Sequence, residues 1–129
     1  MIENGPAGTT IVALDGEFDI AQRERMNDAF GAALDSALIV LDLKRTKYFD
    51  SVALGCIMRL KKNAADRGGA LVIVGASDFA KRVFRITKFD QQVEIRNSLG
   101  DIDASRIPLR GGIQRIELVA KSLDVRRPF

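Results

Sequence analysis

The chain has 129 residues, 47% hydrophobic and 29% charged, a balance typical of one globular domain with its own core. It contains no histidine, which excludes serine–histidine–acid triads and histidine-bearing zinc sites. A nucleic-acid surface combines clusters of basic residues with stacking aromatic side chains. This chain has a net charge of only +3, no tryptophan and one tyrosine, so we expect no nucleic-acid partner.

The sequence shows no apolar run long enough to span a bilayer and no signal-peptide pattern at its polar start. We therefore expect a cytoplasmic protein without membrane insertion. The single cysteine, Cys56, cannot form an internal disulfide and falls inside a predicted helix. We expect it to be a buried small apolar residue, and a reactive thiol is the alternative that the absence of histidine disfavours.

The first predicted strand begins at Thr9 and ends between Leu14 and Phe18, because TTIVAL is rich in β-formers. Asp19 is the expected cap of the helix that follows. The apolar positions of that helix recur at helical spacing and are Met26, Ala29, Phe30 and Ala33. We expect the helix to end around residues 35–36.

Residues 38–65 form the central unit, which we interpret as a buried strand, a short polar crossing and a helix. The apolar run at 38–41 is typical of a strand covered on both faces. The helix is predicted to start after Asp50 and Ser51, with Ser51 as its cap, and to stop at the glycine pair 68–69. A hydroxyl at a helix start that follows a central strand suits an anion, a phosphate or a partner.

A further apolar strand is predicted at 70–74, and Ser77 or Asp78 is the expected cap of a third helix. Phe79, Val83 and Ile86 are expected on one face of this helix, with Phe84 beside them. An edge strand at 93–95 and one or two weak helical turns within 97–105 complete the pattern. Strands alternating with helices predict an α/β fold with a mainly parallel sheet and right-handed crossovers.

Residues 108–129 differ from the rest and are treated as a C-terminal extension of a domain formed by residues 1–107. Pro108 and the glycine pair 111–112 break regular structure. The helical spacing of Ile116, Val119, Ala120 and Leu123 favours an amphipathic helix. GIQRIELVA fits a strand nearly as well, and both alternatives stay open. The segment could dock on the domain, bridge protomers or stay mobile, so the oligomeric state stays open too.

Six short motifs follow one another along the chain. They are Gly16-Glu17-Phe18-Asp19, Asp42-Leu43, Phe49-Asp50-Ser51, Leu54-Gly55, Gly68-Gly69-Ala70-Leu71 and the segment from Phe79 to Phe84. Together they resemble the STAS domain, named for sulphate transporters and anti-sigma factor antagonists. The resemblance covers about residues 9–104. It implies an α/β, STAS-like (SpoIIAA-like) fold, with a mainly parallel or mixed sheet of four or five strands and three or four helices.

The resemblance implies a regulatory binding module, not an enzyme, with no cofactor and no metal. Stand-alone members typically bind a serine kinase that is also an anti-sigma factor, and the kinase phosphorylates a Ser or Thr at the helix start. We therefore expect an anti-sigma factor antagonist-type signalling protein that acts in transcription regulation. Its expected partner-binding residues are Asp19, Asp50, Ser51, Val52 and Ser77. The alternative role is a non-enzymatic STAS subunit of a membrane transport assembly.

The chain departs from the family motif where the phosphate is normally accepted. The second hydroxyl residue of the motif corresponds to Val52, and its glycine to Ala53, so Ser51 matches only the first hydroxyl. Three interpretations of Ser51 stay open: a plain helix cap, a displaced phosphorylation site, or a contact residue that phosphate never switches. A small enzyme using this helix start as an oxyanion or phosphate site is a third class, which no Gly-rich loop or base–nucleophile pair supports.

Overall fold

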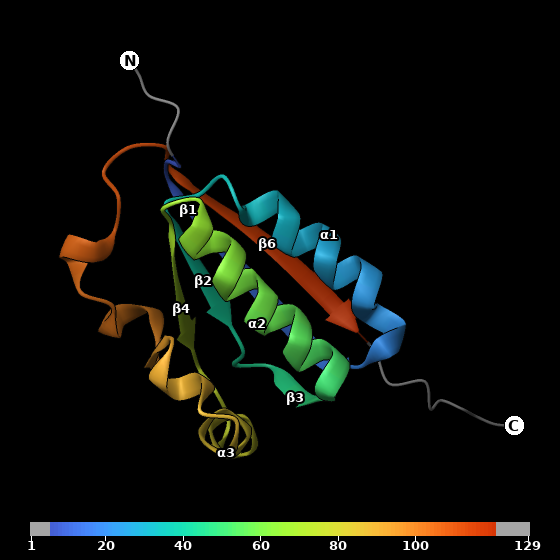
Figure 1. Cartoon of the computed structure of the whole chain (residues 1–129). Coiled ribbons are helices and arrows are strands. Elements are labelled where there is room, and N and C mark those ends of the chain that lie inside the picture. Colours follow the sequence, from blue (N-terminus) through green and yellow to red (C-terminus); the bar gives the residue numbers. More distant parts are fainter. Residues whose placement is uncertain (1–5, 121–129) are drawn as a thin grey trace, which may run out of the picture.

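One six-stranded sheet organises the chain in the computed structural model, which describes residues 6–120 (Figure 1). Every strand pairs in parallel with its neighbours. The strands are β1 (Thr9–Phe18), β2 (Leu38–Asp42), β3 (Thr46–Phe49), β4 (Ala70–Val74), β5 (Glu94–Arg96) and β6 (Ile113–Ala120). Because Gly16 is the register partner of both Thr46 and Ala120, β3 and β6 lie on opposite edges of β1.

Strand β1 is central to this arrangement. Strands β2 and β3 follow one another along one of its edges, and β4 and β5 extend the sheet beyond β2. On the other edge, β6 runs beside β1 from Thr9 to Gly16. The strand order therefore places the start of α2, which follows β3, on the side of β1 away from β6.

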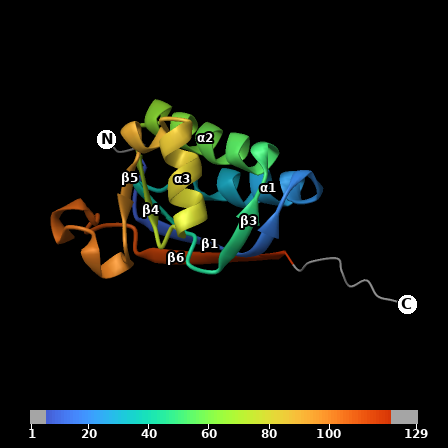
Figure 2. The same cartoon turned by 90° about the horizontal axis from the view of Figure 1, so that it is seen from below.

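Three helices lie on one side of the sheet, as the two views show (Figures 1 and 2). They are α1 (Arg23–Ala33), α2 (Ser51–Asp66) and α3 (Asp78–Ile86), and short 3₁₀ turns occur at Ile20–Gln22, Phe89–Gln91, Leu99–Asp101 and Ala104–Arg106. Among the described residues, no helix combines the length and the apolar character that crossing a membrane requires.

The core occupies both faces of the central strands. Ile39 and Leu41 of β2 belong to the large cluster beneath the helices. Leu38 and Val40 belong to a second cluster on the opposite face, which Ile102 covers. This two-sided burial explains the unbroken apolar run of β2, as expected for parallel strands.

The structure confirms the expected α/β, STAS-like fold and has one more strand than the upper limit of the expected range. Strand β3 lies in the segment interpreted as a polar crossing: Thr46 and Phe49 point inward, whereas Lys47 and Tyr48 are exposed. Strand β6 resolves the open alternatives for the tail, because Ile113–Ala120 is a strand of the sheet and not a helix. Leu123 and the rest of 121–129 lie outside the described residues.

The apolar face expected on the third helix, Phe79, Val83 and Ile86, is not the face that is most deeply buried. Ala80 and Phe84 are buried, whereas Phe79 is 39% exposed and Ile86 is 73% exposed. The face of α3 that packs on the sheet is centred between Ala80 and Phe84, so Phe79 lies at the border of that face. From there the Phe79 ring contacts Tyr48 and Phe49 of β3.

Candidate functional site

The ends of β1 and β3 bring two helix starts together. Phe18 and Phe49 are register partners, and the backbone N–H of Asp50 donates to the Phe18 carbonyl at 3.1 Å. Asp19 follows Phe18 directly, so Asp19 and Asp50 leave neighbouring strands at the same end. Each aspartate then opens a helical segment.

Asp50, not Ser51, is the cap of α2. Asp50 has the extended backbone of an N-cap, and its Oδ1 accepts from the Ala53 N–H at 2.9 Å. This is the geometry that satisfies an unpaired helical donor. Ser51 is therefore the first residue inside the helix, and it is exposed. The interpretation of Ser51 as a plain cap is wrong, because the neighbouring carboxylate makes the bond and leaves the hydroxyl at the surface.

Asp19 caps the chain entry to α1, as expected from the sequence. Its Oδ1 accepts from the Ala21 N–H at 2.8 Å, while Gln22 Oε1 accepts from the Asp19 N–H at 2.8 Å. This reciprocal capping box satisfies two backbone donors at once. The first turn is 3₁₀, and α1 begins only at Arg23. The caps hold both carboxylates in fixed positions beside the start of α2.

Two exposed aromatic side chains lie next to this helix start. The Tyr48 and Phe79 rings stack with centroids 5.6 Å apart, and Phe79 meets Phe49 edge-on at 5.3 Å. Tyr48 is 47% exposed although it is part of this aromatic stack. Tyr48 was not among the predicted site residues, and Phe79 was expected only on an apolar face of the third helix. The available signal was the order Tyr48, Phe49, Asp50, in which an outward strand position precedes a buried one.

We call the helix-start surface the set formed by Asp19, Tyr48, Asp50, Ser51, Val52 and Phe79. The structure brings Asp19, Asp50, Ser51 and Val52 together through the β1–β3 pairing, with Val52 half-buried beside Ser51. Ser77 lies at a different helix start, where its exposed hydroxyl accepts from the Ala80 N–H at 3.1 Å and caps α3. Ser77 precedes Phe79, a member of the helix-start surface, by two residues in the chain.

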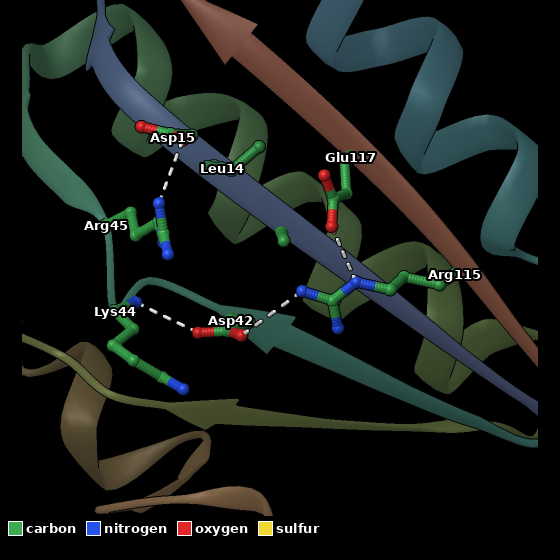
Figure 3. A pocket seen from close by; sticks show the side chains of 8 residues that line it. Leu14, Asp15, Asp42, Lys44, Arg45, Arg115 and Glu117 are labelled. Carbon is green, nitrogen blue, oxygen red and sulfur yellow. Dashed lines mark hydrogen bonds and ion pairs between the residues drawn. The ribbon is translucent and has the colours of Figure 1, made fainter.

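A polar hollow of about 230 Å³ lies between β1, β2 and β6 on the sheet face away from the helices (Figure 3). It is lined by Ala13, Leu14, Asp15, Asp42, Lys44, Arg45, Arg115 and Glu117. Arg115 Nε contacts Glu117 at 2.8 Å, and its Nη2 approaches Asp42 at 4.0 Å. Three acidic and three basic side chains balance one another, so the hollow has no charge excess to attract an ion.

Cys56 lies buried on α2, as expected. Burial raises the pKa of its thiol above the ordinary value of 9.0, although the nearby Arg59 and Arg23 act in the opposite direction. A raised pKa leaves less of the nucleophilic thiolate. Among residues 6–120, no group of three or more His, Cys, Asp or Glu side chains is arranged to hold a metal ion.

The fold and the site define a small parallel α/β domain that presents a capped helix start and exposed aromatic rings at one end of its sheet. The chain belongs to the STAS domain family: the family model described as "Mlab, STAS domain" matches residues 3–99. Members of this family are generally binding and regulatory modules.

Known proteins similar to this chain include regulators and transport proteins. An anti-sigma-B factor antagonist of Listeria monocytogenes is 28% identical over 92 residues, which cover 70% of this chain and 81% of the relative. A sulfate transporter family protein from Wolinella succinogenes has a TM-score of 0.65 at 16% identity, covering 76% of this chain and 84% of that one. An anti-sigma factor antagonist from Mycobacterium paratuberculosis has a TM-score of 0.62 at 21% identity, covering 70% and 80%.

Proposed function

We propose that this protein is a cytoplasmic regulatory module of the anti-sigma factor antagonist type, which docks a partner protein on its helix-start surface. The observation that carries the proposal is the division of roles between Asp50 and Ser51. Asp50 caps α2, so Ser51 stays exposed, and the exposed Tyr48–Phe79 pair packs on Phe49, the residue before Asp50. The similarity to anti-sigma factor antagonists supports the same role.

The chemistry of this surface suits a protein partner. Exposed aromatic rings that are already held in one orientation lose little conformational freedom on binding, and Tyr is frequent among the residues that dominate interface energies. Stacking on Phe79 and the edge-on contact of Phe79 with Phe49 hold the Tyr48–Phe79 pair in this way. Val52 adds partly exposed apolar area in the first turn of α2.

Ser51 is the acceptor that we assign when the partner is a serine kinase, because Val52 has no hydroxyl. A phosphate adds about −1.5 to −2 charges. The start of α2 favours an added anion, whereas the Asp19 and Asp50 carboxylates repel it. At a docked surface the added charge must be desolvated against these two carboxylates, so phosphorylation is expected to release the partner.

The test uses the anti-sigma factor kinases encoded in the same genome, each purified and titrated calorimetrically against this chain. We expect one to bind, and we expect Ser51→Glu and Phe79→Ala each to weaken binding by at least tenfold. Lys62→Ala is the matched control on α2, because Lys62 is exposed and pairs with Asp66 one turn further along the helix. Incubation with ATP followed by mass spectrometry then tests Ser51 as the acceptor.

Two outcomes would count against the proposal. If no kinase binds, the anti-sigma role fails. If binding is unchanged by both helix-start substitutions, the docking surface lies elsewhere. An absence of phosphate on Ser51 despite tight binding would leave Ser51 as a contact residue and remove its role as a phosphorylation site.

A second candidate function is a non-enzymatic subunit of a membrane transport assembly. The matching family model carries the name Mlab, and the sulfate transporter family protein shares the fold. Val52 in place of the usual acceptor suits a subunit that stays bound without a phosphate switch. Copurification with transport ATPases of the same genome, instead of the kinases, would favour this role, and we expect Phe79→Ala to weaken that contact too.

A further inference from the structure

Strand β6 forms an edge of the sheet with a long unpaired side. Among the described residues, β1 is its one strand partner, and it pairs with β6 along all eight residues from Ile113 to Ala120. Ile113 and Val119 are exposed apolar residues on this strand. An edge of this length with apolar side chains is a template for pairing with another strand.

The residues that direct their backbone groups outward can be identified. The Gly112 carbonyl accepts from the Thr9 N–H at 2.9 Å and so faces β1. Backbone groups of successive strand residues face alternate edges, so the outward-facing residues are Ile113, Arg115, Glu117 and Val119. The Val119 carbonyl agrees with this alternation, because the Arg25 guanidinium of α1 donates to it at 3.0 Å.

The sequence IQRIELV of this strand is complementary to itself when read in the opposite direction. In an antiparallel pair centred on Ile116, Arg115 lies opposite Glu117 of the second copy, and Ile113 lies opposite Val119. A shift of two residues one way sets Arg115 opposite Arg115, and a shift the other way sets Glu117 opposite Glu117. Opposed like charges destabilise a strand pair, so the charge pattern selects the register centred on Ile116.

We propose that β6 pairs antiparallel with β6 of a second copy of this chain and joins the two sheets into one. Backbone hydrogen bonds and the Ile113–Val119 contacts hold the pair. Arg115 exchanges its 2.8 Å contact with Glu117 of its own strand for the Glu117 across the interface. Because both side chains are exposed, the exchanged ion pair adds little to the affinity of the dimer, and its main effect is to select the strand register.

The pairing has two consequences for the rest of the molecule. Since β3 and β6 lie on opposite edges of β1, the helix-start surface stays open in the dimer. Arg25 must release the Val119 carbonyl before that residue can pair with Ile113 of the second copy. Arg25 therefore competes with dimer formation and acts as a protecting charge on the edge.

Sedimentation equilibrium of the full chain, from low to high micromolar concentration, tests the pairing. The wild type is expected to associate reversibly to a dimer. Arg115→Glu and Glu117→Arg are each expected to weaken the dimer by about tenfold, because each opposes two like-charged pairs. The double variant with both changes restores the complementary pairs and is expected to recover the wild-type affinity. Arg25→Ala is expected to strengthen the dimer.

A cross-link checks the register without altering charge. In the proposed dimer, Ile116 lies on the two-fold axis and faces Ile116 of the second copy. The two residues form a non-hydrogen-bonded pair, in which the Cα atoms of antiparallel strands are about 4.5 Å apart, within disulfide range. Ile116→Cys is therefore expected to give a covalent dimer with oxidised glutathione. Gln114→Cys is the control: its two copies would be about 13 Å apart and should not cross-link. The native Cys56 is buried and does not compete.

A wild-type chain that stays monomeric at high micromolar concentration would overturn this inference. So would a dimer that neither single charge reversal weakens, that the double variant fails to restore, or that cross-links equally through position 114. Circular dichroism of each variant separates loss of pairing from loss of fold. These results leave the partner-binding proposal untouched, since its substitutions lie at the helix-start surface.

Discussion

Asp19 and Asp50 are neighbours because the Asp50 N–H donates to the carbonyl of Phe18, the residue before Asp19, at 3.1 Å. Both side chains then cap a helical segment, through Ala21 and Ala53 respectively. The same pairing therefore fixes two carboxylates and leaves Ser51 exposed as the first residue of α2. The proposed binding surface depends on this arrangement of backbone, caps and rings.

The division of roles at the start of α2 predicts unequal effects on stability. Asp50→Ala removes the bond to the Ala53 N–H and is expected to lower the free energy of unfolding by about 1 kcal/mol. Ser51→Ala removes no cap and is expected to change it by less than about 0.5 kcal/mol. Urea unfolding of both variants measures the difference. Equal losses would mean that Ser51 shares the capping role, and Asp50→Asn is the control that keeps an acceptor.

The β1–β6 contact predicts opposite effects for two glycines. Gly16 has a φ of +118°, and a Cβ there would lie 1.9 Å from the Ala120 carbonyl oxygen. Gly16→Ala is expected to cost about 1–3 kcal/mol and to loosen the end of β6. Gly55 lies within α2 with open space around it, so Gly55→Ala is expected to gain about 0.5–1 kcal/mol. Unfolding curves that showed no difference between the two variants would contradict the close approach of β6 at Gly16.

The aromatic stack predicts a separation of stability from binding. Phe84 is fully buried, and Phe84→Ala is expected to cost about 3–5 kcal/mol. Phe79 is partly exposed, so Phe79→Ala is expected to cost only about 1–2 kcal/mol while it weakens the partner complex. Thermal unfolding and calorimetric titration of the same preparations check both statements. A Phe79→Ala variant that is as unstable as Phe84→Ala would place this ring in the core.

Glu94 predicts a change of stability in mild acid. Its partial burial tends to raise the pKa, but hydrogen bonds from Arg96 and Arg106 outweigh burial and hold the pKa of this carboxyl below its ordinary value of 4.5. A folded-state pKa below the unfolded value stabilises the fold above pH 4.5, and this contribution is lost as pH falls through the folded-state pKa. Glu94→Gln lacks this contribution.

Urea unfolding between pH 3 and pH 7 measures the contribution of Glu94, with wild type and Glu94→Gln compared at each pH. We expect the wild type to be the more stable near pH 7, and the two unfolding midpoints to converge towards pH 3. A difference that stays constant over this range would show that the arginine contacts do not depend on the charge of Glu94.

The sequence predicted those parts of the fold whose pattern is set locally. Residues 38–42 and 70–74 carry unbroken apolar runs, and α2 has a complete helical stripe ended by glycine. Strand β3 was not predicted, because its exposed residues Lys47 and Tyr48 give the segment the pattern of a polar connection. Strand β6 stayed ambiguous because only contact with β1 decides between its helical and its alternating pattern.

The site was predicted in part, for a related reason. Asp50 and Ser51 are both good capping residues, so residue type could not decide between them. The extended backbone of Asp50, which the pairing of β3 with β1 imposes, makes it the cap. The exposed Tyr48–Phe79 stack joins residues of a strand and a helix that lie 31 positions apart in the sequence, and no local sequence pattern predicts such a contact.

The most direct test of the proposed binding surface is an amide chemical-shift map of the full chain, titrated with the kinase or transport ATPase that binds it most tightly. We predict that the largest changes occur at Tyr48, Asp50, Ser51, Val52 and Phe79. Changes confined to the opposite edge of β1 or to the sheet face away from the helices, with these five amides unmoved, would contradict it.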